Sequence, residues 1–99
     1  MTSIEARQAA EASLESLIAS VQALPTSAAT EAFLHECTAL RLAIHAFHME
    51  AIRFRMFNVD RMITRQSVTL GEEGMHAFAE VRRQLEAAGF HTRSHQAPS

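Results

Sequence analysis

The chain has 99 residues, of which 47% are hydrophobic and 20% are charged, and its formal net charge is −2. This composition excludes an intrinsically disordered chain, and a net charge so close to zero dictates no partner. A single cysteine, no secretory signal and no apolar run long enough to cross a membrane together predict a cytoplasmic protein without a membrane partner.

The first predicted helix covers residues 3–24. Thr2 and Glu5 have the spacing of a capping box, in which each side chain accepts a hydrogen bond from the other residue's free backbone N–H. Apolar side chains then recur every three or four residues, which is the period of a helix with one buried face. They are Leu14, Leu17, Val21 and Leu24. Pro25 ends this helix, and the hydroxyl residues that follow it could cap the next.

The second predicted helix is unusually long and covers residues 27–66, because neither Gly nor Pro interrupts them. A helix of this length measures about 60 Å, whereas a compact chain of about 100 residues has a radius of gyration of about 13 Å. Its own chain could not cover such a helix, which predicts a dimer. Asn and Asp are weak helix formers, so the alternative is a break near Asn58 that would allow a compact four-helix monomer.

Two apolar stripes on this long helix favour an interface between chains. Each repeats every seven residues, as in helices that pack lengthwise. The first comprises Phe33, Leu40, Phe47 and Phe54, and the second comprises Leu42, Met49, Met56 and Ile63. A helix that is apolar on two faces is buried on two faces. The predicted interface residues are Phe33, Leu40, Phe47, Met49, Phe54 and Met56.

The third predicted helix covers residues 72–88. Gly89 suits the position after a helix C-terminus, with Phe90 behind it, and the tail 91–99 is expected to be frayed. The short turn before this helix predicts that it packs antiparallel on the end of the long helix. The predicted fold is therefore all-α, with a single domain over residues 1–90. In it, three helices per chain form a bundle of four-helix cross-section by dimerisation.

Histidines offer the first candidate chemistry, with six in the chain. His45 and His48 share a helix face at i, i+3 spacing, which suits two imidazole ligands of a divalent transition metal. Glu73 and His76 form a Glu-x-x-His pair, the spacing used in carboxylate di-metal bundles, but no second such pair occurs. Two ligands do not make a site. We therefore expect no cofactor, and a divalent metal is the alternative.

Cys37 has Arg41 one turn later, which would favour its reactive thiolate form. However, it lies between Phe33 and Leu40 on the first apolar stripe. We therefore expect a buried, unreactive thiol.

Four arginines of the long helix could bind phosphate groups. They are Arg53, Arg55, Arg61 and Arg65. They do not share one face, acidic residues lie among them, and the chain has no Tyr or Trp for base stacking. The sequence does not favour a nucleic-acid partner.

Methionine and phenylalanine are concentrated in residues 47–62. Flexible thioethers and aromatic rings form adaptable apolar surfaces that bind the helices of a partner. The sequence thus predicts a non-catalytic helical interaction protein, such as an adaptor, chaperone or regulatory subunit. It would act as a homodimer and could bind another protein in an apolar groove. The alternatives are a bundle that binds a metal or small ligand through histidines of the long helix, and an enzyme of unknown type.

Overall fold

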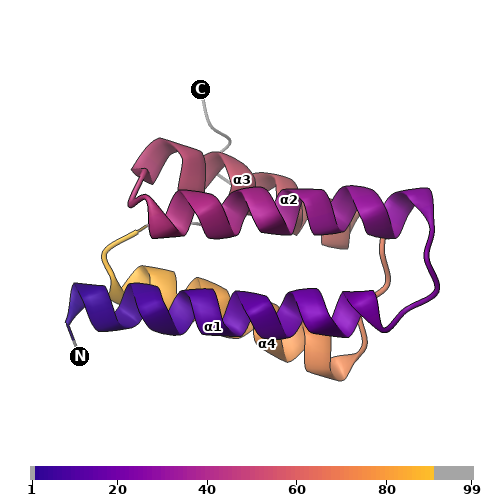
Figure 1. Cartoon of the computed structure of the whole chain (residues 1–99), viewed down its shortest axis with the longest axis horizontal. Coiled ribbons are helices and arrows are strands. Elements are labelled where there is room, and N and C mark those ends of the chain that lie inside the picture. The colour runs from indigo at the N-terminus through magenta and orange to yellow at the C-terminus, as the bar shows by residue number, and fades with distance from the viewer. Residues whose placement is uncertain (1, 91–99) are drawn as a thin grey trace.

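The computed structural model describes residues 2–90, which form four helices joined by short connections (Figure 1). They are α1 (Ser3–Gln22), α2 (Ala28–His45), α3 (Met49–Thr64) and α4 (Glu72–Ala87). No strand occurs among the described residues, so the all-α class is confirmed. The tail predicted over residues 91–99 lies outside the described residues.

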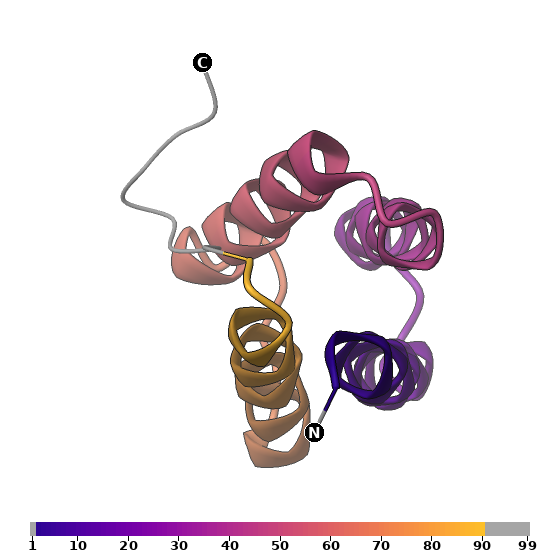
Figure 2. The same ribbon diagram turned by 90° about the vertical axis from the view of Figure 1, so that its left-hand side faces the viewer.

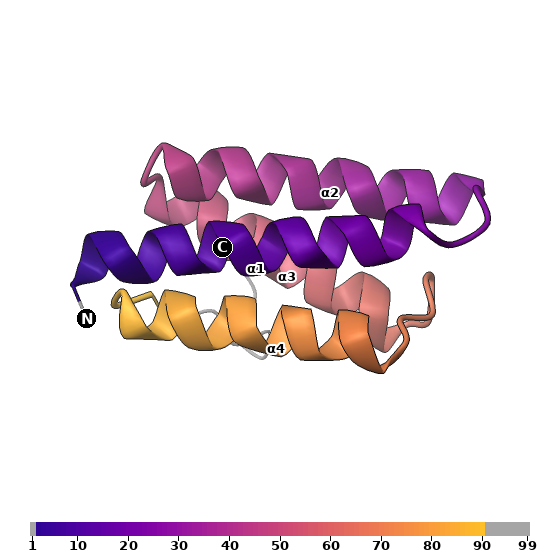
Figure 3. The ribbon, with the colours of Figure 1, turned by 60° about the horizontal axis from the view of Figure 1, so that its bottom comes forward.

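Successive helices run antiparallel and form an up-down-up-down bundle (Figures 1 and 3). α1 packs against both α2 and α4, and α2 packs against α3, so α1 and α3 lie at opposite corners (Figure 2). α3 and α4 lie farther apart than the other neighbouring helices. No Cα atom of one comes within 8 Å of a Cα atom of the other. An ion pair spans this more open side, with a guanidinium nitrogen of Arg82 3.2 Å from a carboxylate oxygen of Asp60.

Small side chains bring α1 and α4 together. Ala6 and Ala10 of α1 and Ala77 of α4 are buried, and a Cβ at Gly74 would come within 3.1 Å of the Ser20 hydroxyl. The distance between two packed helices depends on the side chains at their contact. The larger buried side chains gather between the helices and include Leu14, Leu17, Phe33, Leu40, Ile44, Ile52, Met56, Val59, Val81 and Leu85. One chain therefore has a core of its own.

The long helix predicted over residues 27–66 is wrong, because the chain turns back at residues 46–48, between α2 and α3. Phe47 adopts the left-handed conformation, with a φ of 57°. The backbone N–H of His48 donates to the carbonyl of Ala43 at 3.0 Å. This is the hydrogen bond of a Schellman motif, which ends many helices and usually has glycine at the left-handed position.

The alternative break near Asn58 is also wrong. Asn58 lies within α3, and its amide donates to the Glu36 carboxylate of α2 at 2.8 Å. The same carboxylate accepts a hydrogen bond from Arg55 at 2.7 Å, so two residues of α3 hold α2. The new helix instead begins at Met49. Its N-cap is His48, whose Nδ1 accepts the backbone N–H of Ala51 at 3.1 Å.

The break corrects the three-helix description to four helices and removes the reason for a dimer built on one continuous helix. With a radius of gyration of 12.4 Å, the molecule has the size expected of a compact chain. The dimer itself stays a prediction. None of the helices is long and apolar enough to span a bilayer within residues 2–90.

The ends of the first and last helices agree with the sequence. The capping box of α1 is present, since Glu5 N–H donates to the Thr2 hydroxyl at 3.1 Å and Thr2 N–H donates to the Glu5 carboxylate at 3.2 Å. Ser27 caps α2. Gly89 follows α4 in the left-handed conformation, with a φ of 98°, and Phe90 is buried behind it. Local hydrogen-bonding signals therefore predicted these ends well.

Candidate functional site

The two histidines with metal-ligand spacing have separate structural roles. His45 lies in the last turn of α2, with its Nδ1 3.4 Å from the Glu11 carboxylate of α1. His48 is the N-cap of α3, and its Nδ1 accepts the N–H of Ala51. Among residues 2–90, no three side chains of His, Cys, Asp or Glu are placed to hold a metal ion. The i, i+3 spacing of His45 and His48 therefore does not bring together a set of metal ligands in the described residues.

Glu73 and His76 lie on α4 beside α1, in an open groove of about 270 Å³. The groove is lined by Ser13, Ser16, Glu73, His76, Ala77 and Glu80. The Glu80 carboxylate accepts hydrogen bonds from the Arg83 guanidinium, which lower the pKa of that carboxyl below its ordinary value. One of the two carboxylates of this groove is therefore already paired within α4.

The Cys37 thiol is buried, as expected from its apolar neighbours. Burial, together with the nearby Glu36 carboxylate, raises the pKa of the thiol to about 12. The reactive thiolate is therefore absent at neutral pH. Cys37 belongs to the core and not to a catalytic site.

The six predicted interface residues fall into two groups. Phe33, Leu40 and Met56 have no exposed surface and pack in the core of their own chain. About half of each remaining side chain is exposed; these residues are Phe47, Met49 and Phe54. Only the second group is available to a partner in the folded chain.

Phe47 is held by its own chain despite its exposure. The guanidinium carbon of Arg7 lies 4.2 Å from the centroid of its ring, within the range of a cation–π contact. The ring of Phe90 meets it edge to face, with 5.5 Å between centroids. Phe47 therefore anchors the turn between α2 and α3.

The solvent side of α3 combines aromatic and cationic side chains. Helical spacing places six residues on this side, which we call the α3 face: Glu50, Arg53, Phe54, Phe57, Arg61 and Arg65. Phe54 is 45% exposed and Phe57 is half-buried. A guanidinium lies over each ring, with Arg55 5.2 Å from the centroid of Phe54 and Arg61 5.8 Å from that of Phe57. The α3 face is thus an aromatic surface edged by positive charge.

The arginines of the α3 face have no carboxylate partner among residues 2–90. Four other arginines form ion pairs, which are Arg41–Glu15, Arg55–Glu36, Arg82–Asp60 and Arg83–Glu80. Within the described part of the chain, no acidic group lies within ion-pair distance of Arg53, Arg61 or Arg65. These three cations and the single acid Glu50 give the α3 face a net charge of +2.

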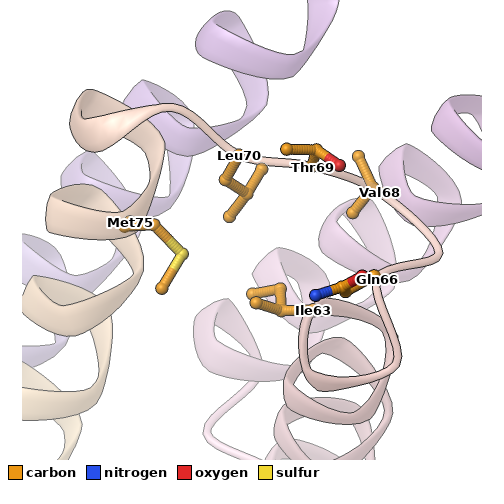
Figure 4. Close-up of a pocket in the computed structure, with 6 residues that line it drawn as sticks. All are labelled: Ile63, Gln66, Val68, Thr69, Leu70 and Met75. Atoms are coloured by element: carbon orange, nitrogen blue, oxygen red, sulfur yellow. The ribbon is translucent and has the colours of Figure 1, made fainter.

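An open notch lined by apolar and polar side chains lies between the end of α3 and the start of α4 (Figure 4). We call it the α3–α4 notch; it encloses about 370 Å³ and is lined by Ile63, Gln66, Val68, Thr69, Leu70 and Met75. Arg65 of the α3 face immediately precedes Gln66, so the two features meet at the C-terminal end of α3. The sequence pattern does not predict the notch, because the notch depends on how far apart α3 and α4 lie.

Comparison with protein-family models, with curated proteins and with solved structures gives no match to this chain. The α3 face and the α3–α4 notch are two surface features that the packing of the described residues leaves uncovered.

Proposed function

We propose that this chain is a non-catalytic helical interaction protein that binds another protein through the α3 face. The observation that supports this most is Phe54, a phenylalanine 45% exposed on the solvent side of α3. Around it lie arginines to which the described residues supply no acidic partner. Aromatic residues and arginine are the residue types enriched at the centres of protein–protein interfaces.

Exposure alone would not single out Phe54, because isolated exposed apolar side chains are normal on protein surfaces. Leu42, on α2, is 63% exposed and is such a case. Phe54 differs because Phe57 and the unpaired arginines lie within a few helical turns of it on the same side of α3. The combination, and not the single side chain, favours a binding surface.

A second copy of the chain is the alternative occupant, as the sequence prediction of a homodimer requires. Two α3 faces packed on one another would bring six arginines together with only two acids, the Glu50 of each copy, and an excess of like charge across an interface is unfavourable. We therefore favour a different protein as the partner. The proposed location is still the cytoplasm, where thiols such as that of Cys37 stay reduced.

Site-specific photo-crosslinking in cells that make the protein tests this proposal. A photoreactive phenylalanine analogue at Phe54 preserves the shape of the ring, and the same analogue at Gln8, on the exposed side of α1, is the matched control. We expect a discrete adduct with another protein from position 54 and none from position 8. An adduct of two 11.0 kDa chains would identify the homodimer instead. Absence of any adduct from position 54 would contradict the proposal.

A further inference from the structure

We infer that the α3 face binds an acidic amphipathic helix of another protein, an inference that rests on the proposed function. Its basis is charge complementarity. The face has three arginines that no carboxylate of the described chain pairs with, and its one acid, Glu50, lies at the far N-terminal end of α3. Complementary charge across an interface selects the partner and accelerates its association.

The spacing of the cations defines the partner's pattern. Arg53 and Arg61 are eight residues apart on one side of α3, which places their Cα atoms about 12 Å apart along the helix. Arg65 follows one turn later. A partner helix that lies along α3 presents carboxylates at the same interval when Asp or Glu residues recur every four or eight positions.

Phe54 and Phe57 define the apolar part of the pattern. Their rings lie between the cations along α3, so the partner's carboxylates must flank apolar side chains that cover these rings. The α3–α4 notch extends the apolar surface, since Ile63 and Met75 lie across from each other there (Figure 4). An apolar residue at the end of the partner helix that lies over Arg65 would contact the notch.

A second copy of this chain does not fit the α3 face as well as a foreign helix. Exposed acids of this chain lie on α1, through Glu5 and Glu15, and at the start of α4, through Glu72 and Glu73. Because α1 and α3 lie at opposite corners of the bundle (Figure 2), a contact between α3 of one copy and α1 of the next would not close into a dimer. Such a contact continues as an open chain of molecules.

The first measurement uses a fluorescein-labelled helical peptide with Glu at every fourth position and Leu on the adjoining face. Its control is the same peptide with each Glu replaced by Gln. In fluorescence anisotropy we expect the acidic peptide to bind about tenfold more tightly than the control, and this difference to shrink as NaCl is raised from about 50 to about 300 mM. Equal binding of the two peptides, or no binding of the acidic one, would overturn the inference.

Two matched variants locate the binding surface. Arg61→Glu reverses one charge on the α3 face, and Arg83→Glu makes the same change on α4. We expect Arg61→Glu to weaken binding of the acidic peptide about tenfold, while Arg83→Glu changes it less than about twofold. Circular dichroism checks that both variants keep the helical fold. Equal effects of the two substitutions would show that only the net charge matters and would overturn the assignment to α3.

A single-stranded oligonucleotide is the competing probe. If it binds more tightly than the acidic peptide and loses binding in Arg61→Glu, the ligand is a nucleic acid and the inference is overturned. The crosslinking experiment keeps the two proposals distinct. A position-54 adduct without acidic-peptide binding leaves the proposed function standing and rejects the acidic helix, whereas absence of the adduct rejects the proposed function itself.

Discussion

Cys37 illustrates how burial sets the chemistry of a single residue. It lies on the core side of α2 with no exposed surface, and burial raises the pKa of its thiol to about 12. The neighbouring cation that the sequence offers as an activator, Arg41, pairs instead with Glu15 of α1 at 3.8 Å. The apolar neighbours of Cys37 in the sequence predicted this outcome correctly, because burial on a helix stripe is a local periodic signal.

The raised pKa of Cys37 predicts a loss of stability at alkaline pH. The thiol has an ordinary pKa of 9.0, and the folded chain raises it to about 12. Stability is therefore unaffected below pH 9 and falls as the pH rises toward 12, because only the unfolded chain then loses the proton. The slope reaches about 1.4 kcal/mol per pH unit. The chain contains no Lys or Tyr, so no other side chain obscures this range.

Urea unfolding followed by circular dichroism at pH 8, 9, 10 and 11 measures this dependence. Cys37→Ala is the control. It lowers stability at every pH by removing a buried group, but we expect its stability to stay flat where that of the parent chain falls. A parent chain whose stability does not change between pH 9 and pH 11 would show that the thiol is accessible to water.

Three helices of the chain end with the same backbone motif. Phe47, Gln66 and Gly89 all adopt positive φ, of 57°, 58° and 98°, and the residue after each donates its N–H to a carbonyl of the last helical turn. Glycine adopts this conformation freely, whereas a residue with a Cβ is destabilised there by about 1 kcal/mol. Of these three residues, only Gly89 is of a type that predicts the motif from the sequence. The end of α2 was therefore not predictable from residue type, whereas the helix end predicted at residue 66 lies within two residues of the end of α3.

Gln66→Gly should stabilise the protein for this reason. Relief of the left-handed strain exceeds the added freedom of the unfolded chain, so we expect the free energy of unfolding to rise by about 0.5 kcal/mol. Thr64→Gly, at the last residue of α3, is the control and should lower it by about 0.3 kcal/mol, because threonine is itself a weak helix former. Urea unfolding at pH 7 measures both. A destabilised Gln66→Gly would mean that the helix does not end at this residue.

The whole molecule is shaped by the break at Phe47. Without it, the apolar residues of α2 and α3 would need a second chain. With it, α3 packs on α2, and α2 packs on α1. In this arrangement the backbones of α3 and α4 stay apart, and the α3–α4 notch lies where the two helices are joined. The surface proposed for binding therefore results from the packing of the whole chain.

The molar mass in solution tests whether one chain is sufficient to form the folded molecule. Because the core is covered within one chain, we expect light scattering at micromolar concentration to give about 11.0 kDa. Refractive index must report the concentration, since the chain has no Trp or Tyr. A mass of twice this value that drops in Phe54→Glu would show that the α3 face binds a second copy, contrary to our proposal.

The sequence by itself determined the helical class and the ends marked by local signals. The Thr2–Glu5 capping box and Gly89 act through hydrogen bonds within a single helical turn, so neighbouring residues are sufficient to predict them. The candidate site was predictable only in part, since Phe54 was expected at an interface but the notch was not expected at all.

Only the tertiary structure decided where the long helix breaks and which apolar residues remain outside. A seven-residue apolar repeat is the same whether a helix packs on its own chain or on another, so Leu40 and Phe54 could not be told apart. The left-handed turn at Phe47 is supported by Arg7 and Phe90, which are distant in the sequence. Contacts between distant residues, and not local propensity, set the course of this chain.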